Sequence, residues 1–102
     1  MIRPRRSLLF VPALRPDRYL KALEVGADIV CIDMEDAVAI DRKDEGRAAT
    51  LPLFRERTHP NVEKMVRING LSTYHGLKDL QALVESDAPP ESIMIPKIRS
   101  AE

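Results

Sequence analysis

The sequence predicts a single α/β domain built on a parallel sheet, and three features of its 102 residues support this. Four short apolar runs rich in branched side chains recur at 7–11, 28–33, 64–69 and 92–96, and longer stretches with helical spacing separate them. Apolar residues occupy both alternating positions of each run, as in parallel strands covered on both faces. Hydrophobic residues make up 44% of the chain, which is enough for one small core.

The first helical stretch follows the run 7–11 and carries signals at both ends. Pro16 lies at an early position, where its fixed backbone torsion suits the entry into a helix. Leu20 and Leu23 are spaced three apart, and Gly26 comes just past the expected end, where a left-handed residue often caps a helix.

The second helical stretch is expected to begin at Asp41, a residue type that suits the N-cap. Asp44 and Glu45 follow in its first turn, where the helix dipole stabilises carboxylates. Pro52 then predicts a kink or a break.

The third helical stretch starts near Ser72, and the pair 89–90, two prolines, prevents its continuation. One stripe of this helix is apolar: Leu77, Leu80, Leu83 and Val84.

Right-handed helical connections between parallel strands build either an open doubly wound sheet or a closed eight-stranded barrel, and four strands do not decide between them. A barrel needs about 250 residues, so this chain could supply only its first half.

Composition argues against several classes of protein. The 16 basic residues balance 16 acidic ones, and a formal charge of zero argues against a nucleic-acid partner. No stretch approaches the ~20 apolar residues that span a membrane, and the run 8–11 is too short for a signal-peptide core. A single cysteine, Cys31, excludes a disulfide framework, so we expect a reducing compartment, the cytoplasm or at most an organelle matrix.

Charged or polar side chains follow every predicted strand, at the edge where parallel α/β proteins carry their chemistry. They are Arg15 and Arg18 after the first strand, Asp33, Glu35 and Asp36 after the second, Arg67 and Asn69 on the third, and Lys97 and Arg99 after the fourth.

Three acids within four residues raise each other's pKa unless a cation lies nearby. If the second strand continues past Asp33, Glu35 shares its face and Asp36 lies on the other. Two interpretations stay open, and both can hold. Arg67 of the neighbouring strand supplies an internal ion pair, or the acids surround a hard cation such as magnesium.

Arg67 lies in an otherwise apolar strand, where an unpaired buried charge would cost several kcal/mol, so it must meet an anion. Its guanidinium suits a substrate carboxylate or an enolate oxyanion as well as a structural carboxylate.

The other strand-end cations have simpler interpretations. Lys97 is most simply a solvated surface lysine. A charged helix start is the simpler interpretation of Arg15 and Arg18, although free amides there would also favour phosphate.

Several motifs, in order along the chain, resemble the start of the citrate lyase beta subunit and its relatives. They are RSLLFVP at 6–12, RP at 15–16, GAD at 26–28, IDMEDAV at 32–38, VRIN at 66–69 and IPKIRSAE at 95–102. This HpcH/HpaI aldolase-like family also includes malyl-CoA and citramalyl-CoA lyases. The resemblance implies the N-terminal half, about four βα units, of a TIM (β/α)8 barrel. Residues 1–102 would be a partial barrel domain with its first four strands and three helices.

The same resemblance implies a magnesium-dependent carbon–carbon lyase or aldolase-type enzyme acting on a hydroxyacyl thioester, such as citryl-, citramalyl- or malyl-CoA or a carrier-bound equivalent. By that resemblance Arg67 is catalytic, binding the substrate's carboxyl or carbonyl oxygens and steadying the enolate. Glu35 and Asp36 would line the magnesium site without binding the ion directly.

Further substrate contacts are implied for four residues. Phe10, Arg15 and Arg18 would lie along the coenzyme A or acyl-carrier arm, and Lys97 at the rim of the pocket. The sequence departs from the family pattern at Ala13, usually Gly, and more mildly at 34 and 68, where Met and Ile replace Leu and Val.

The family's acidic magnesium ligands and its lid come from later strands, so the resemblance implies that the 102 residues alone are inactive. The alternative function is a non-catalytic half-barrel that binds a CoA-like ligand or a partner chain. Open strand edges tend to associate, so we expect a homo-oligomer.

Overall fold

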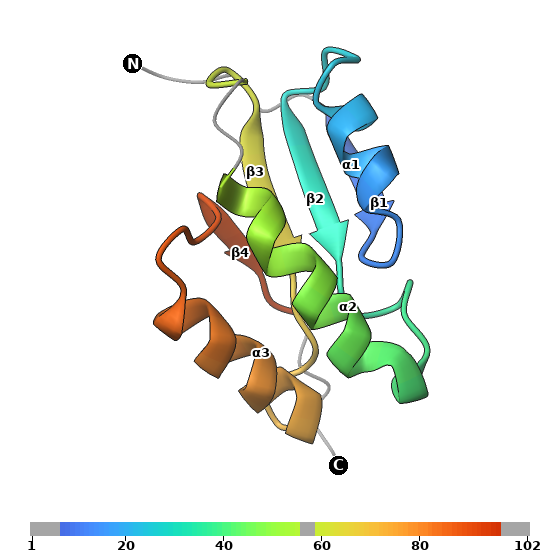
Figure 1. Cartoon of the computed structure of the whole chain (residues 1–102), viewed down its shortest axis with the longest axis vertical. Helices are drawn as coiled ribbons and strands as arrows, with labels where there is room; N and C mark the ends of the chain where they lie inside the picture. Colours follow the sequence, from blue (N-terminus) through green and yellow to red (C-terminus); the bar gives the residue numbers. More distant parts are fainter. Residues whose placement is uncertain (1–6, 56–58, 97–102) are drawn as a thin grey trace.

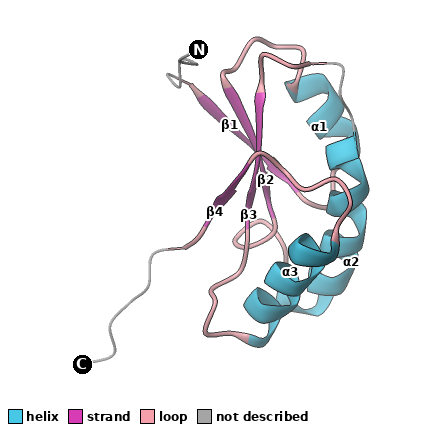
Figure 2. Ribbon diagram, turned by 90° about the vertical axis from the view of Figure 1, so that its left-hand side faces the viewer, coloured by secondary structure: helices cyan, strands magenta, loops and turns pink. Residues whose placement is uncertain are grey.

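The computed structural model describes residues 7–55 and 59–96, which form one parallel sheet with helices on one side. The strands are β1 (Leu8–Pro12), β2 (Ile29–Asp33), β3 (Glu63–Arg67) and β4 (Ser92–Met94). Their order in the sheet is their order in the chain. A doubly wound sheet reverses its strand order and carries helices on both faces, whereas a barrel does neither. The arrangement in Figure 2 is therefore that of a barrel segment.

The helices are α1 (Pro16–Ala22), α2 (Lys43–Thr50) and α3 (Tyr74–Glu85), and α2 and α3 pack side by side (Figure 1). Two short 3-10 segments, η1 (Ile40–Arg42) and η2 (Leu51–Arg55), flank α2. The predicted alternation of strands and helices is confirmed, with bounds shifted by one to a few residues. None of the helices in the described part of the chain has the length and apolar character needed to cross a bilayer.

Two of the predicted helix ends differ from those in the structure. The helix α1 stops at Ala22, earlier than expected, and Gly26 takes its left-handed conformation, with φ of +93°, at the end of the following turn. Asp41 is not the N-cap of α2, because it lies within η1 and Arg42 occupies the cap. The helix begins with a 3-10 turn, and no side chain caps its first amides. The predicted break at Pro52 is confirmed, since α2 gives way there to η2.

The helix α3 packs through a face that its apolar stripe does not indicate. Its buried residues are Gly76, Asp79 and Leu83, whereas Leu77 and Val84 are 59% and 77% exposed. Thr73 caps the helix, accepting a 3.0 Å hydrogen bond from the amide of Gly76. A Cβ at 76 would lie 1.8 Å from the carbonyl oxygen of Gly70, so only glycine allows the first turn of α3 to approach the end of β3 this closely.

The two faces of the sheet carry different residues. The face toward the helices packs alternate strand residues against them in the main core: Val11, Val30, Ile32, Val66 and Ile68 with Tyr19, Leu23, Phe54 and Leu83. The opposite face has a smaller apolar cluster of Ile29, Cys31 and Met65. Register aligns Pro12, Asp33, Arg67 and Met94 in one row on that face, at the carboxyl end of the sheet. The strand-end residues of interest therefore share one face and one edge.

Candidate functional site

Arg67 and Asp33 form the centre of the candidate site. They are register partners on adjacent strands, so their side chains leave the same face of the sheet. The Nε and Nη2 atoms of Arg67 donate to the two carboxylate oxygens of Asp33 at 3.0 and 2.7 Å. Such a two-point contact holds the planar guanidinium in one orientation. The predicted ion pair between Arg67 and the acids after the second strand is confirmed.

The segment after β2 turns the other two acids toward the same guanidinium. The carboxylate of Asp33 also accepts hydrogen bonds from the backbone amides of Glu35 at 2.8 Å and Ala37 at 3.2 Å, which closes the turn. Glu35 and Asp36 carboxylate oxygens then lie 3.5 and 3.7 Å from Arg67 nitrogens. The division of these acids between opposite faces required β2 to continue past Asp33. The strand ends at Asp33, so its alternation does not reach Glu35 and Asp36.

The charges at this site stabilise one another. Burial disfavours the ionised form of Asp33, but hydrogen bonds from Arg67 and from the amides of Glu35 and Ala37 outweigh it and hold the pKa of the Asp33 carboxyl below its usual value. The hydrogen bond to Asp33, followed by the charges of Asp33, Glu35 and Asp36, raises the pKa of Arg67 above its usual value. The site therefore keeps a permanent cation within a group of carboxylates.

An aromatic ring completes the surroundings of Arg67. The guanidinium carbon lies 4.8 Å from the ring centroid of Phe10, a cation–π contact. Phe10 is 43% exposed, and it is on the same face of the sheet as Arg67. The structure thus brings Phe10 and Arg67 together on one face of the sheet.

The remaining predicted residues lie away from this cluster or outside the described residues. Arg15 is in the turn after β1, where its guanidinium binds the exposed carboxylate of Asp17 at 3.1 and 3.2 Å. Arg18 lines a hollow of about 280 Å³ beside β1, together with Phe10 and Lys21. Lys97 lies outside the described residues.

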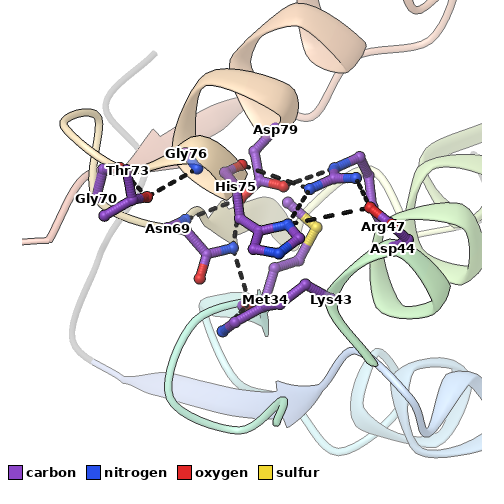
Figure 3. A network of polar contacts seen from close by, with 10 residues as sticks. All are labelled: Met34, Lys43, Asp44, Arg47, Asn69, Gly70, Thr73, His75, Gly76 and Asp79. Carbon is purple, nitrogen blue, oxygen red and sulfur yellow. Dashed lines mark hydrogen bonds and ion pairs between the residues drawn. The ribbon is translucent and has the colours of Figure 1, made fainter. Parts of the chain in front are cut away.

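A second polar cluster, which the sequence reasoning did not identify, joins α2 and α3 to the segment after β3 (Figure 3). The buried carboxylate of Asp79 accepts hydrogen bonds from Arg47 Nε at 2.7 Å and from the Asn69 side-chain nitrogen at 2.6 Å. Arg47 also lies 3.2 Å from Nδ1 of His75, which accepts when that nitrogen carries no proton. The position of Asp79 three residues after Gly76 and four before Leu83 was the available signal, because that spacing places an acid on a buried helix face.

The described residues do not by themselves form a metal centre. Within 7–55 and 59–96, no group of three or more His, Cys, Asp or Glu side chains could hold an ion. Both oxygens of Asp33 are occupied by Arg67 and the backbone, whereas Glu35 and Asp36 are part-exposed and exposed. These two acids can accept hydrogen bonds from a bound water but do not enclose an ion.

Comparison with known proteins identifies the family. The profile of the HpcH/HpaI aldolase/citrate lyase family matches residues 6–102. The chain belongs to this family. The resemblance found in the sequence motifs is therefore confirmed.

Relatives of this HpcH/HpaI chain have names that refer to CoA thioesters. The mitochondrial citramalyl-CoA lyase of Homo sapiens is 33% identical over 99 residues, which are 97% of this chain and 29% of that protein. The (3S)-malyl-CoA thioesterase of Cereibacter sphaeroides is 36% identical over 98 residues, 96% of this chain and 34% of that protein. The chain thus spans about a third of the length of the curated relatives it matches.

A solved relative confirms the fold. The protein CitE from Mycobacterium tuberculosis, in complex with magnesium, acetoacetate and coenzyme A, superposes with a TM-score of 0.74 at 34% identity. The match covers 95% of this chain and 35% of that one. The four parallel strands are part of a TIM-barrel-like fold in the HpcH/HpaI family, as expected. The roles of individual site residues stay predictions.

Proposed function

We propose that this chain supplies the anion-binding wall of a magnesium-dependent carbon–carbon lyase that acts on a hydroxyacyl thioester. The observation that carries the proposal is the state of Arg67. Asp33 holds its Nε and Nη2, while Nη1 donates no hydrogen bond to any described residue, and the side chain is 22% exposed. The guanidinium is therefore oriented and charged, with donor capacity left for a substrate oxygen.

The surroundings of Arg67 suit the stabilisation of a developing negative charge. Cleavage next to a thioester carbonyl produces an enolate, whose oxygen needs donors that are already in place. Asp33 and the ring of Phe10 fix the guanidinium before substrate arrives, so little reorganisation is needed. Arg67 would bind the substrate's carboxyl or carbonyl oxygen and hold it through bond cleavage.

Magnesium is part of this proposal because the CitE relative was solved with it. The ion supplies Lewis-acid polarisation of a carbonyl when bound. Glu35 and Asp36 would accept hydrogen bonds from its water ligands, and the direct ligands would come from residues other than those described.

The thioester arm is proposed to run past β1. The hollow beside this strand is lined by apolar side chains and by two cations, Arg18 and Lys21. Apolar walls suit the alkyl part of the arm and cations suit its phosphates. Arg15 would contribute only after releasing Asp17, and Lys97 stays a proposed rim residue.

The test is a coupled assay for acetyl-CoA release from citramalyl-CoA or malyl-CoA with magnesium. We expect no turnover by the 102 residues alone, and turnover when the remaining segment of a relative is added to complete the barrel. In that mixture Arg67→Lys should lower kcat about 100-fold or more, because a point charge replaces the oriented fork.

Arg55→Lys is the matched control, since this arginine makes an exposed ion pair with Asp87 and has no part in the site. Undiminished turnover in the Arg67→Lys mixture would overturn the assigned role. Turnover by the 102 residues alone would overturn the expected inactivity.

A second candidate is a non-catalytic half-barrel that pairs with another chain. It is favoured by apolar side chains exposed at both edges of the sheet, Leu9 and Phe10 on β1 and Ile93 on β4. Pairing of two copies, a homo-oligomer, would cover these edges. Sedimentation separates the candidates: a monodisperse dimer supports this function, and a heterogeneous aggregate argues against it.

We also propose a reducing compartment, the cytoplasm, as the location. The one thiol of the sequence, Cys31, is free and buried. Recovery of the protein in the cytosolic fraction after cell disruption would support this, and recovery in an organelle fraction would argue against it.

A further inference from the structure

A continuous line of hydrogen bonds joins α3 to the acid loop, defined here as residues 34–36. Oδ2 of Asp79 accepts from the backbone amide of Asn69 at 2.9 Å and from its side-chain nitrogen at 2.6 Å. The same side-chain nitrogen donates to the carbonyl oxygen of Met34 at 3.1 Å. Figure 3 shows Asn69 lying between Asp79 and Met34. A helix carboxylate thus holds an amide that in turn holds the first residue of the acid loop.

The acid loop is fixed at further points. The amide of Met34 donates to the carbonyl oxygen of Arg67 at 2.9 Å. Lys43 Nζ donates to the carbonyl oxygens of Met34 and Glu35 at 3.2 and 2.5 Å. The positions of the Glu35 and Ala37 amides, which bind Asp33, depend on the path of this loop. A shift at Met34 would therefore reach the carboxylates around Arg67.

The ion pair with Arg47 does not account for all the hydrogen bonds of the Asp79 carboxylate. Its Oδ1 accepts from Arg47, whereas Oδ2 makes both bonds to Asn69. Asp79 is 1% exposed and Asn69 is 6% exposed, so all these bonds form away from water, where a missing partner is costly. One of the two carboxylate oxygens of Asp79 therefore binds only Asn69 among the described residues, through its backbone and side-chain amides.

We infer that Asp79, acting through Asn69, is a positioning residue that sets the path of the acid loop and so the arrangement of carboxylates around Arg67. This inference rests on the proposed function only for the role of Arg67 in binding substrate. Asp79 and Asn69 are both buried. Their contribution is the rigidity of the loop, supplied from a helix on the opposite side of the sheet from Arg67.

Amide hydrogen exchange of the 102-residue chain tests this inference without magnesium or thioester. The amides of Glu35 and Ala37 report the loop, and the amide of Ile32, in the central strand β2, reports global unfolding. In Asp79→Asn and in Asn69→Ala, the loop amides should exchange about tenfold faster relative to Ile32, the factor that corresponds to about 1.4 kcal/mol.

Asp44→Asn is the matched control. Asp44 binds the same Arg47 at 2.8 Å but has no bond to Asn69, so the exchange ratio should stay unchanged. Should Asp79→Asn fail to fold, Asp79→Glu retains the charge that Arg47 needs while displacing Oδ2, and the same acceleration is expected. An unchanged ratio in Asn69→Ala would overturn the inference, because the hydrogen bond that links Asp79 to Met34 through Asn69 would be broken without effect.

The two proposals fail separately. Unchanged exchange ratios in these variants, with turnover in the reconstituted barrel, would refute the positioning role alone. Accelerated exchange without any turnover would refute the proposed function alone.

Discussion

Arg67 and Asp33 meet through two hydrogen bonds, of 3.0 and 2.7 Å, although 34 residues separate them in the chain. Both belong to the last row of the strand register, so the pairing of β2 with β3 places the cation and the carboxylate opposite each other. Asp33 simultaneously closes the turn that carries Glu35 and Asp36. One carboxylate thereby orients the guanidinium and shapes the acid loop.

Replacing Arg67 should destabilise the fold. In Arg67→Met the buried carboxylate of Asp33 loses its partner, and three acids repel one another. Breaking a fully buried pair costs about 3–5 kcal/mol, and the 22% exposure of Arg67 reduces this to about 2–3 kcal/mol. Urea unfolding measures the change in free energy. Arg15→Met, which removes an exposed pair with Asp17, should leave the midpoint unchanged. Equal effects of the two variants would contradict the central role of the Arg67 pair.

The contribution of Asp33 should depend on pH in one direction. Its pKa is lower in the folded chain than the ordinary value of 3.8, so the stability it contributes is complete above that value and is lost as pH falls through the folded-state pKa. Urea unfolding of wild type and Asp33→Asn should give a constant difference in free energy from pH 7 to about 5 and a shrinking one below about pH 4. A difference as large at pH 2 as at pH 7 would show that charge is not its source.

Gly76→Ala should be strongly destabilising. The added Cβ would lie 1.8 Å from the oxygen of Gly70 and 2.8 Å from that of Asn69, both backbone atoms that cannot move aside alone. We expect a loss of about 2–3 kcal/mol or more in urea unfolding, as for overpacked cores. Gly70→Ala is the control, because its Cβ would meet nothing closer than Thr73 at 3.8 Å. A Gly76→Ala variant as stable as Gly70→Ala would show that α3 is not seated this tightly.

The thiol of Cys31 should resist modification in the folded chain. Burial, followed by the charge of Asp33, raises its pKa to about 12, and the side chain is 0% exposed. At pH 8 only about one thiol in 10⁴ would be ionised even where reagent reached it. Reaction with a disulfide reagent should therefore be slow in buffer and rapid in denaturing urea. Rapid labelling in buffer would mean that the apolar cluster on the sheet face opposite the helices opens readily.

Much of the site could be predicted from local features of the sequence. A guanidinium inside an apolar strand requires an anion, and the acids after the preceding strand are the nearest candidates at the same edge of a parallel sheet. The pairing of Arg67 with these acids followed from that argument. Helix and strand order followed from apolar periodicity and from Pro16 and Pro52, whose effects are local.

Other features of the site depended on where each strand ends and on how closely the helices approach the strand ends. That Glu35 and Asp36 both face Arg67 results from the end of β2 at Asp33, which alternation alone does not reveal. The buried face of α3 is decided by the approach of Gly76 to Gly70, a contact that buries Asp79 and exposes part of the apolar stripe.

The sequence by itself determined the order of the elements, the family and the need of Arg67 for an anionic partner, because these depend on residue type, spacing and chain order. Only the tertiary structure decided that Asp33 binds the Nε and Nη2 atoms of Arg67 and that Asp79 reaches the acid loop through Asn69. The physical reason is that strand register and helix seating are set by packing between distant segments, and these bonds form only once that packing is in place.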